Sequence, residues 1–157
     1  MDVNVEKALK NISFIERFEY ISEKYSAERL LQDNLVRLYY FDGEEIMKII
    51  KKCGYDSSFD KKEKFFKIKE ELIDKYVFSV QIKIRDGLID LLWLLKENDI
   101  ILLGSPLSSY SRSLIDINYR IKNPVISDYE DIEEILRYTF EMYQDFKKEY
   151  LRIRFVY

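Results

Sequence analysis

The residues with the clearest potential for chemistry are Gln81 and Lys83, which alternate along a run of strand-forming residues and follow Asp74. An acidic residue followed by a Gln/Glu-x-Lys triplet on a strand is the outline of a metal-dependent nuclease site, in which oxygen ligands hold a divalent cation. The triplet is short, and polar residues on the solvent-facing side of a strand need no catalytic explanation. We therefore rank a nuclease that uses carboxylates, a lysine and Mg²⁺ third, after two hypotheses in which the protein only binds a partner.

The chain has few residues for other kinds of catalysis, because it has no histidine and one cysteine, Cys53. Histidine is the commonest proton-transfer residue, and its absence removes Ser-His and Cys-His pairs and nearly every zinc site. Cys53 continues the apolar face of a predicted helix, which favours a role in the core. The serines between Ser105 and Arg112 have no histidine partner and no G-x-S-x-G motif, so we interpret them as cap and loop residues. We expect no catalytic residue, no metal site and no cofactor.

Acidic and basic residues are distributed unevenly around a net charge of −3. Lysines predominate over residues 48–75, but Glu70, Glu71 and Asp74 interrupt them. We interpret this span as a set of solvated helix faces and expect no nucleic-acid partner. Acidic residues predominate over residues 127–150, so the small net charge conceals two regions of opposite sign.

Residues 76–104 predict an antiparallel meander. Between Tyr76 and Ile84 apolar and polar residues alternate strictly, with the two-residue period of a strand that has one buried side. Asp86-Gly87 tolerates the positive φ angles of a two-residue hairpin, so residues 88–95 should fold back as a second strand. The run from 88 to 95 is apolar all round, which suits a central strand better than a helix. Residues 100–103 predict a third strand.

The amino-terminal half predicts helices from capping residues and apolar stripes. One helix follows the stripe from Val5 to Ile12, and a second begins after the capping box Ser13-Phe-Ile-Glu16. A third begins at Asp42-Gly-Glu-Glu45 and ends at Gly54, where a left-handed terminating residue is wanted. Residues 60–75 carry apolar residues at helical spacing and predict a fourth helix.

Two shorter elements and a loop complete the chain between these helices and the last one. Residues 35–41 are rich in Leu, Val and Tyr, which favours a short strand. Ser105 is expected to cap a short helix opened by Pro106. Asn123-Pro124 predicts a loop or an edge.

The clearest helix covers residues 128–150 and follows the capping box Ser127-Asp-Tyr-Glu130. Its apolar residues occupy one sector, which we expect to be buried. The opposite face carries four acidic residues with one tyrosine among them: Glu130, Glu134, Tyr138, Glu141 and Asp145. Solvation alone explains such a face. A partner site explains it as well, because a tyrosine surrounded by carboxylates suits the anchor and charged surround of a protein interface.

Together these elements predict one α+β domain over residues 1–157, with several helices packed on an antiparallel β-sheet. No segment approaches the roughly 20 apolar residues that a membrane helix requires, and the amino terminus lacks the pattern of a secretory signal. A lone cysteine agrees with a reducing compartment. We therefore expect a cytoplasmic protein with no membrane partner.

Three segments together resemble the small immunity proteins of bacterial polymorphic-toxin and contact-dependent growth inhibition systems. They are YVFSVQIKIRDGLIDLLWLL at 76–95, ILLGSPLSSYSR at 101–112 and SDYEDIEEILRYTFEMYQDFKKEYL at 127–151. The likeness is one of overall pattern and covers roughly residues 39–151, whereas the tail 152–157 has no place in it. The resemblance implies a cytoplasmic, non-catalytic protein that binds the carboxy-terminal toxin domain of its cognate effector, often a nuclease. It implies inhibition by occlusion of the toxin's active site or substrate surface.

The resulting hypotheses are ordered as follows. A toxin-neutralising immunity protein comes first, a regulatory or adaptor module that binds an unrelated partner comes second, and the nuclease comes third. For a binding protein, we expect the partner surface on the acidic face of the last helix. The loop from Ser105 to Arg112 is the next candidate.

Overall fold

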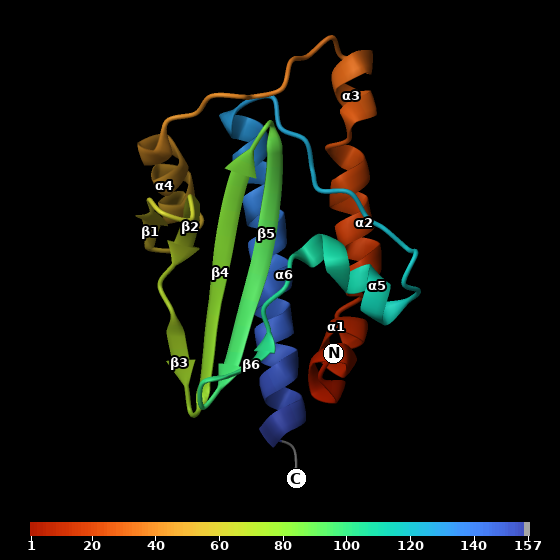
Figure 1. The fold of residues 1–157 in the computed structure, drawn as a ribbon, viewed down its shortest axis with the longest axis vertical. Helices are drawn as coiled ribbons and strands as arrows, with labels where there is room; N and C mark the ends of the chain where they lie inside the picture. The colour runs from red at the N-terminus through yellow and green to blue at the C-terminus, as the bar shows by residue number, and fades with distance from the viewer. Residues whose placement is uncertain (156–157) are drawn as a thin grey trace.

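The computed structural model describes residues 1–155, which form one antiparallel sheet with helices gathered mainly on one side of it (Figure 1). The helices are α1 (Val3–Asn11), α2 (Phe14–Lys24), α3 (Ala27–Gln32), α4 (Gly43–Lys52), the short 3₁₀ helix η1 (Leu107–Ser109), α5 (Tyr110–Leu114) and α6 (Tyr129–Phe155). The strands are β1 (Ser57–Asp60), β2 (Phe65–Ile68), β3 (Glu71–Ile73), β4 (Tyr76–Arg85), β5 (Leu88–Glu97) and β6 (Ile100–Leu103). The predicted α+β class and the predicted meander are confirmed.

The sheet is organised around the long hairpin of β4 and β5. Its strand order is β1-β2-β4-β5-β6, with β3 also paired to β4. The turn residues Asp86 and Gly87 have φ angles of 55° and 73°, as the Asp-Gly pair predicts. A two-residue turn fixes the register along the whole hairpin, from Arg85 opposite Leu88 to Tyr76 opposite Glu97.

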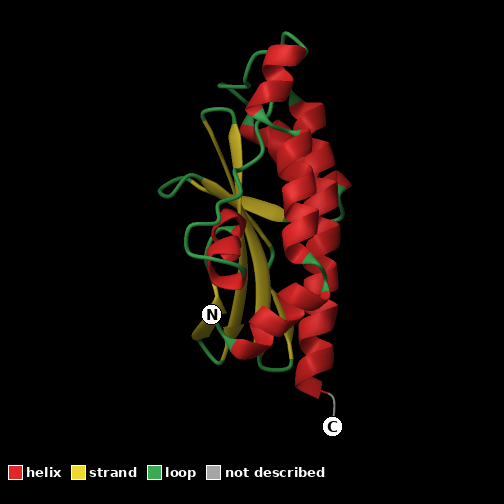
Figure 2. Ribbon diagram, turned by 90° about the vertical axis from the view of Figure 1, so that its right-hand side faces the viewer, coloured by secondary structure: helices red, strands yellow, loops and turns green. Residues whose placement is uncertain are grey.

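One face of the sheet is covered by helices, as the side view shows (Figure 2). The buried side of β4 is the alternating set that the sequence predicts, and β5 adds Trp93 at its centre. Trp93 lies among aromatic rings from other elements, including Phe14 of α2 and Phe146 of α6. Burial of large aromatic side chains supplies much of the stabilisation of a domain of this size. This layer of rings joins the sheet to the helices in one core.

The other face of the sheet is only partly covered. α5 lies beside the β5 edge of the sheet (Figure 1), where its Tyr110 packs against Trp93 and Pro106 forms an isolated bridge with Leu92. On β4 and β5, Ser79 and Leu94 are buried on this face, and the other side chains are polar or half-buried; they include Gln81, Lys83 and Asp90. The open face is therefore available to solvent or to a ligand.

The predicted helix over residues 60–75 is wrong. This region forms β1, β2 and β3, and β2 pairs with β4 through Phe66 opposite Ile82. Phe66 and Ile68 are buried on the core side while Phe65 and Lys67 face the other way. Phe65, Ile68 and Leu72 happen to have helical spacing, although the residues of the short strand β2 alternate with a two-residue period. Pairing with the hairpin favours the strand over the helix.

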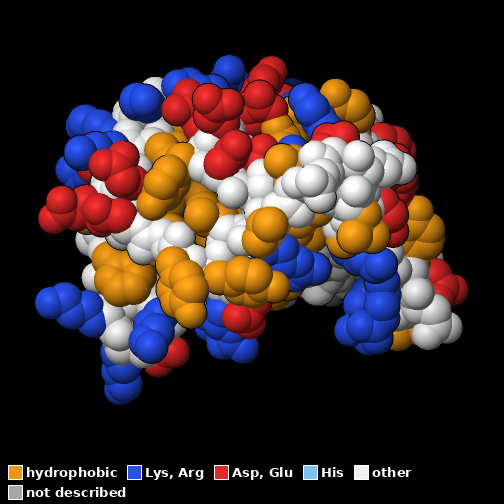
Figure 3. Space-filling model, turned by 90° about the horizontal axis from the view of Figure 1, so that it is seen from above, with side chains coloured by type: hydrophobic (Ala, Val, Ile, Leu, Met, Phe, Trp, Pro, Cys, Tyr) orange, Lys and Arg blue, Asp and Glu red, His pale blue; other side chains and the backbone are white. Residues whose placement is uncertain are grey.

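The predicted strand at 35–41 is also wrong. The segment between α3 and α4 pairs with no strand, and Leu38 is its one residue between 36 and 41 with a backbone hydrogen bond, donated to Ile126 (2.9 Å). Large apolar side chains project from this region into solvent, and Tyr40 is 92% exposed. They belong to the end of the molecule that Figure 3 shows from above, where hydrophobic side chains lie among charged ones. The exposed residues are Leu31, Leu35, Val36, Tyr39 and Tyr40.

The predicted starts of α2 and α4 agree with the structure, whereas some of the predicted capping groups do not. α2 follows Ser13 as predicted, yet Ser13 has φ 56° and its hydroxyl caps nothing. Asp42 caps α4 through the Glu44 amide, and Gly54 ends that helix at φ 101°, both as predicted. The residue before η1 is Pro106, so the predicted cap at Ser105 is wrong.

The last helix is confirmed and extends beyond the predicted 150 to Phe155. Its cap is shifted by one residue from the predicted box. Asp128 accepts a hydrogen bond from the Asp131 amide (2.8 Å), and the Asp131 carboxylate accepts from the Ser127 amide (2.8 Å). Val156 and Tyr157 of the unplaced tail lie outside the described residues. Over residues 1–155, no helix has both the length and the apolar character needed to cross a bilayer.

Candidate functional site

The acidic face of α6 is partly covered, because α2 packs along it. The Tyr138 ring lies against the ring of Tyr20 from α2, with centroids 5.6 Å apart and planes inclined by 33°. The Tyr138 hydroxyl donates a hydrogen bond to the carbonyl of Arg17 (3.0 Å). Tyr138 is therefore half-buried, and the expectation that it lies exposed on the outward face is wrong.

Burial raises the pKa of the Tyr138 hydroxyl above its usual value, and the Arg17 guanidinium opposes this rise only in part. The hydroxyl thus stays protonated and serves as a hydrogen-bond donor across the two helices. Its neighbour Glu141 is close enough to contribute to the same shift. Tyr138 has a structural role between α2 and α6.

Two of the acidic residues are already engaged by α2. Asp145 forms an ion pair with Arg17 (2.9 Å), and Glu134 pairs with Lys24 (3.7 Å). The Tyr25 hydroxyl also donates to Glu134. Such pairs reduce the charge that these two carboxylates present to a partner.

Glu130 and Glu141 are exposed, and within residues 1–155 neither forms an ion pair or a side-chain hydrogen bond. They lie on the same helix on either side of Glu134 and Tyr138. They are the two carboxylates of the predicted set that no cation of the described residues contacts.

Sequence analysis missed Tyr20, which is 54% exposed and packs its ring against that of Tyr138. It falls off the apolar stripe of its own helix, and an aromatic residue in that position was the available signal. We call this surface the α2–α6 seam and define it by one residue of α2 and five of α6: Tyr20, Glu130, Glu134, Tyr138, Glu141 and Asp145. An exposed ring beside charged residues is the composition that protein interfaces favour.

The three residues of the nuclease pattern do not lie together in one site. Gln81 and Lys83 lie on the open face of β4, whereas Asp74 occupies the turn before that strand, roughly 20 Å away along the chain. The carboxylate that lies beside Lys83 is Asp90, its direct partner on β5. Over residues 1–155, no three residues with His, Cys, Asp or Glu side chains gather in a way that could hold a metal ion.

The loop from Ser105 to Arg112 borders a cavity of about 760 Å³ between this loop, α2 and the segment 119–125. Ser108, Ser109 and Arg112 line one side of the cavity, and acidic residues of α2 line the other. Arg112 donates to the carbonyl of Ile117 (3.1 Å), and Ser109 donates to the carbonyl of Pro106 (2.7 Å). These serines stabilise the local chain, in agreement with their interpretation as loop residues.

Cys53 is half-buried and packs against the core, as expected from its place on the apolar face of α4. Burial raises the pKa of its thiol, so the reactive thiolate is disfavoured. Comparison with known proteins finds no family model, curated relative or solved structure that matches the chain.

Proposed function

We propose that the protein is a non-catalytic immunity protein that binds the toxin domain of a cognate effector and occludes its active site or substrate surface. The resemblance of the hairpin, the following loop and the last helix to such proteins suggests this function. The observation that carries it is the tilted ring pair of Tyr20 and Tyr138 beside the unpaired carboxylates of Glu130 and Glu141.

The chemistry of the α2–α6 seam suits a basic partner. Nuclease toxins bind polyanions and so tend to expose basic clefts, to which free carboxylates are attracted over long range. Exposed charges alone bind weakly in salt. Tyr20 supplies an aromatic contact that becomes buried on binding, and rings of this kind are typical anchors of interfaces.

The exposed apolar side chains between Leu31 and Tyr40 support a binding role in general. Large apolar groups gathered on one end of a protein mark surfaces for association. They serve an adaptor as well as an immunity protein, so they favour neither of the two binding hypotheses. The identity of the protein that copurifies with the chain from its native cells distinguishes them.

Co-expression with the toxin gene expected beside this gene tests the proposal. We expect cells to survive and the two proteins to form a stable complex. If cells die although the protein is soluble and abundant, the immunity proposal is wrong.

A charge-reversal variant tests the surface. Glu130→Lys with Glu141→Lys should slow association with the toxin and reduce its salt dependence, because the unpaired charges of the seam then repel a basic cleft. The matched control is Glu44→Lys with Glu63→Lys, which makes the same change in net charge on exposed residues elsewhere. Equal association rates for both variants and the parent would place the partner surface elsewhere, with the loop 105–112 next in line.

A further inference from the structure

The open face of the sheet contains a pair of opposite charges that do not neutralise each other. Lys83 of β4 and Asp90 of β5 are direct cross-strand partners. Such partners have Cβ atoms only about 5 Å apart, yet Lys83 and Asp90 form no ion pair. Lys67 on the same face does pair, with Glu70 at 2.6 Å. The ammonium of Lys83 and the carboxylate of Asp90 thus remain separate groups side by side.

Asp90 also has a carboxylate oxygen, Oδ1, that is buried and accepts no hydrogen bond from the described residues. Burial raises the pKa of Asp90 above its usual value, and Lys83 and Asn123 oppose this rise. A buried acceptor without a donor destabilises the structure relative to a satisfied one. Native structures rarely keep such a group unless an ordered water, a bound ion or molecule, or a function accounts for it.

Both groups line a cavity of about 240 Å³. Its floor is formed by two neighbouring rows of the open face. Gln81 and Leu92 belong to one row, and Lys83 and Asp90 to the other. Glu63, from the turn before β2, adds a second carboxylate to the lining. Pockets for drug-sized ligands start at about 300 Å³, so this cavity suits a smaller molecule.

The lining separates into three kinds of surface. Asp90 and Glu63 can accept hydrogen bonds from a cationic group, and Lys83 and the Gln81 amide can donate to an anionic one. The apolar part of the lining comes from Phe65, Leu92 and Pro106. A simple cation would be repelled by Lys83, and a simple anion by the two carboxylates. A molecule carrying both charges a few bonds apart satisfies all three kinds of surface.

We propose that this cavity binds a small zwitterion, an α-amino acid with an apolar side chain, with its ammonium group on Asp90 and its carboxylate on Lys83. The site is separate from the α2–α6 seam and does not depend on the proposed toxin binding. It gives a role to the Gln81-Ile-Lys83 triplet, which the proposed function leaves unused.

Titration of the full chain with L-leucine, followed by amide NMR shifts, tests the proposal. We expect saturable shifts at residues 81–83 and 90–92. Isopentylamine lacks the carboxylate and 4-methylpentanoate lacks the ammonium group, and each should bind at least about tenfold more weakly, since each leaves one charged side chain of the site unpaired. Absence of saturable shifts with L-leucine overturns the proposal, and so does binding of isopentylamine as tight as that of L-leucine.

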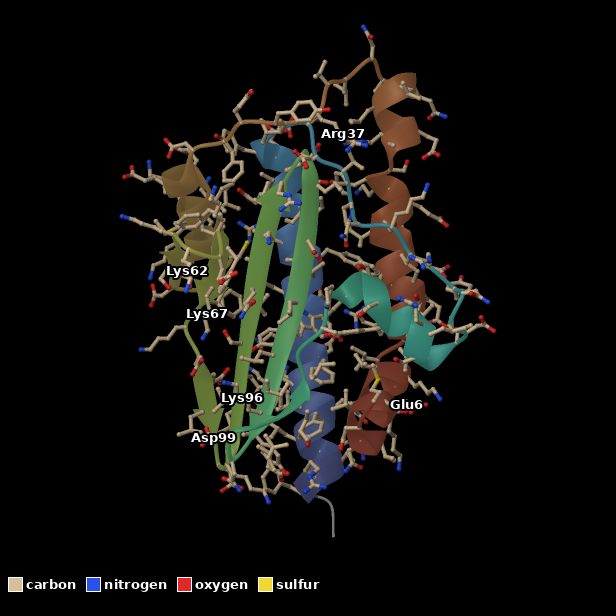
Figure 4. The ribbon with its side chains drawn as sticks, viewed as in Figure 1. Glu6, Arg37, Lys62, Lys67, Lys96 and Asp99 are labelled. Carbon is tan, nitrogen blue, oxygen red and sulfur yellow. The ribbon has the colours of Figure 1, made fainter. Side chains whose placement is uncertain are left out.

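Variants provide the second arm. Asp90→Asn and Lys83→Gln should each weaken L-leucine binding at least about tenfold. The controls are Lys96→Gln, on the same face further along β5, and Asp99→Asn, in the β5–β6 turn, both marked in Figure 4. They should leave binding unchanged. The melting temperature without ligand separates binding from folding, because Asp90→Asn removes a charge whose burial is unfavourable and should not lower it. Unchanged binding in folded Asp90→Asn contradicts the assignment.

Discussion

The rings of Tyr138 of α6 and Tyr20 of α2 pack in a tilted pair with centroids 5.6 Å apart, so the acidic face of the last helix is a contact between two helices as well as a surface. Tyr138 is the inner ring of the pair and donates to the Arg17 carbonyl, whereas Tyr20 is the outer, more exposed ring. Tyr138 therefore holds the two helices together, and Tyr20 is the ring that we propose meets a partner.

Substitution of each ring separates these roles. Tyr138→Ala should destabilise the fold by about 1–3 kcal/mol, through lost packing and a carbonyl left without its donor. Tyr20→Ala should change stability by less than about 1 kcal/mol, yet it should weaken toxin binding by more than about 1 kcal/mol, mainly through faster dissociation. Urea unfolding and binding kinetics measure the two effects. Equal losses of stability in both variants would contradict this division.

Substitution of Gly87 by alanine should destabilise the protein more than the same substitution at Gly54. It has φ 73°, and an added Cβ would lie 2.7 Å from the Arg37 Cβ. Gly54 is the matched control, with φ 101° and no atom within 4 Å of an added Cβ. Gly54→Ala should cost only the strain of positive φ, about 1 kcal/mol, while Gly87→Ala should cost at least about 1 kcal/mol more. Thermal melting of the two variants checks the order, and the reverse order would show that Arg37 moves aside freely.

The pair of Arg29 and Asp131 should make stability depend on acid pH. Burial alone would raise the pKa of Asp131, but the Arg29 guanidinium at 2.6 Å and the amide and hydroxyl of Ser127 outweigh it and hold the pKa below its usual value. A depressed folded-state pKa adds stability that is fully present above the unfolded value of about 4 and is lost as pH falls through the folded value.

Asp131→Asn should therefore reduce the free energy of unfolding by about 1–3 kcal/mol at neutral pH. The difference from the parent should shrink below pH of about 4. Asp33→Asn is the control, because Asp33 is exposed and its side chain accepts no hydrogen bond within the described residues. Urea unfolding at several pH values measures both. A difference that stays constant down to strongly acid pH would show that the charge of Asp131 contributes little.

No Mg²⁺-dependent cleavage of DNA or RNA is expected, because Asp74 lies in a turn far along the strand from Gln81 and Lys83. Incubation of the purified protein with labelled single- and double-stranded substrates checks this. Cleavage that disappears in Lys83→Ala but survives in Lys67→Ala would restore the nuclease hypothesis. Lys67 is a fair control since it lies on the same face, one strand away from Lys83.

Local signals in the sequence determined the hairpin and the last helix. Strict alternation from Tyr76 to Ile84, with the Asp86-Gly87 turn, specifies strand, turn and register from neighbours in the chain. That register also places Lys83 opposite Asp90, so this pair was within reach of the sequence. The long helix carries its own cap and one apolar sector, which are likewise local.

Tertiary structure decided the rest, wherever the local signal was weak or depended on a distant partner. Residues 60–75 became strands because β2 and β3 gain hydrogen bonds from β4, which outweigh an incidental helical spacing. Residues 35–41 are rich in strand-forming residues but found no strand to pair with. The acidic face of α6 was read from one helix alone. Only the approach of α2 decided which of its carboxylates are paired and that Tyr20 joins Tyr138, because side-chain burial depends on contacts between segments far apart in the chain.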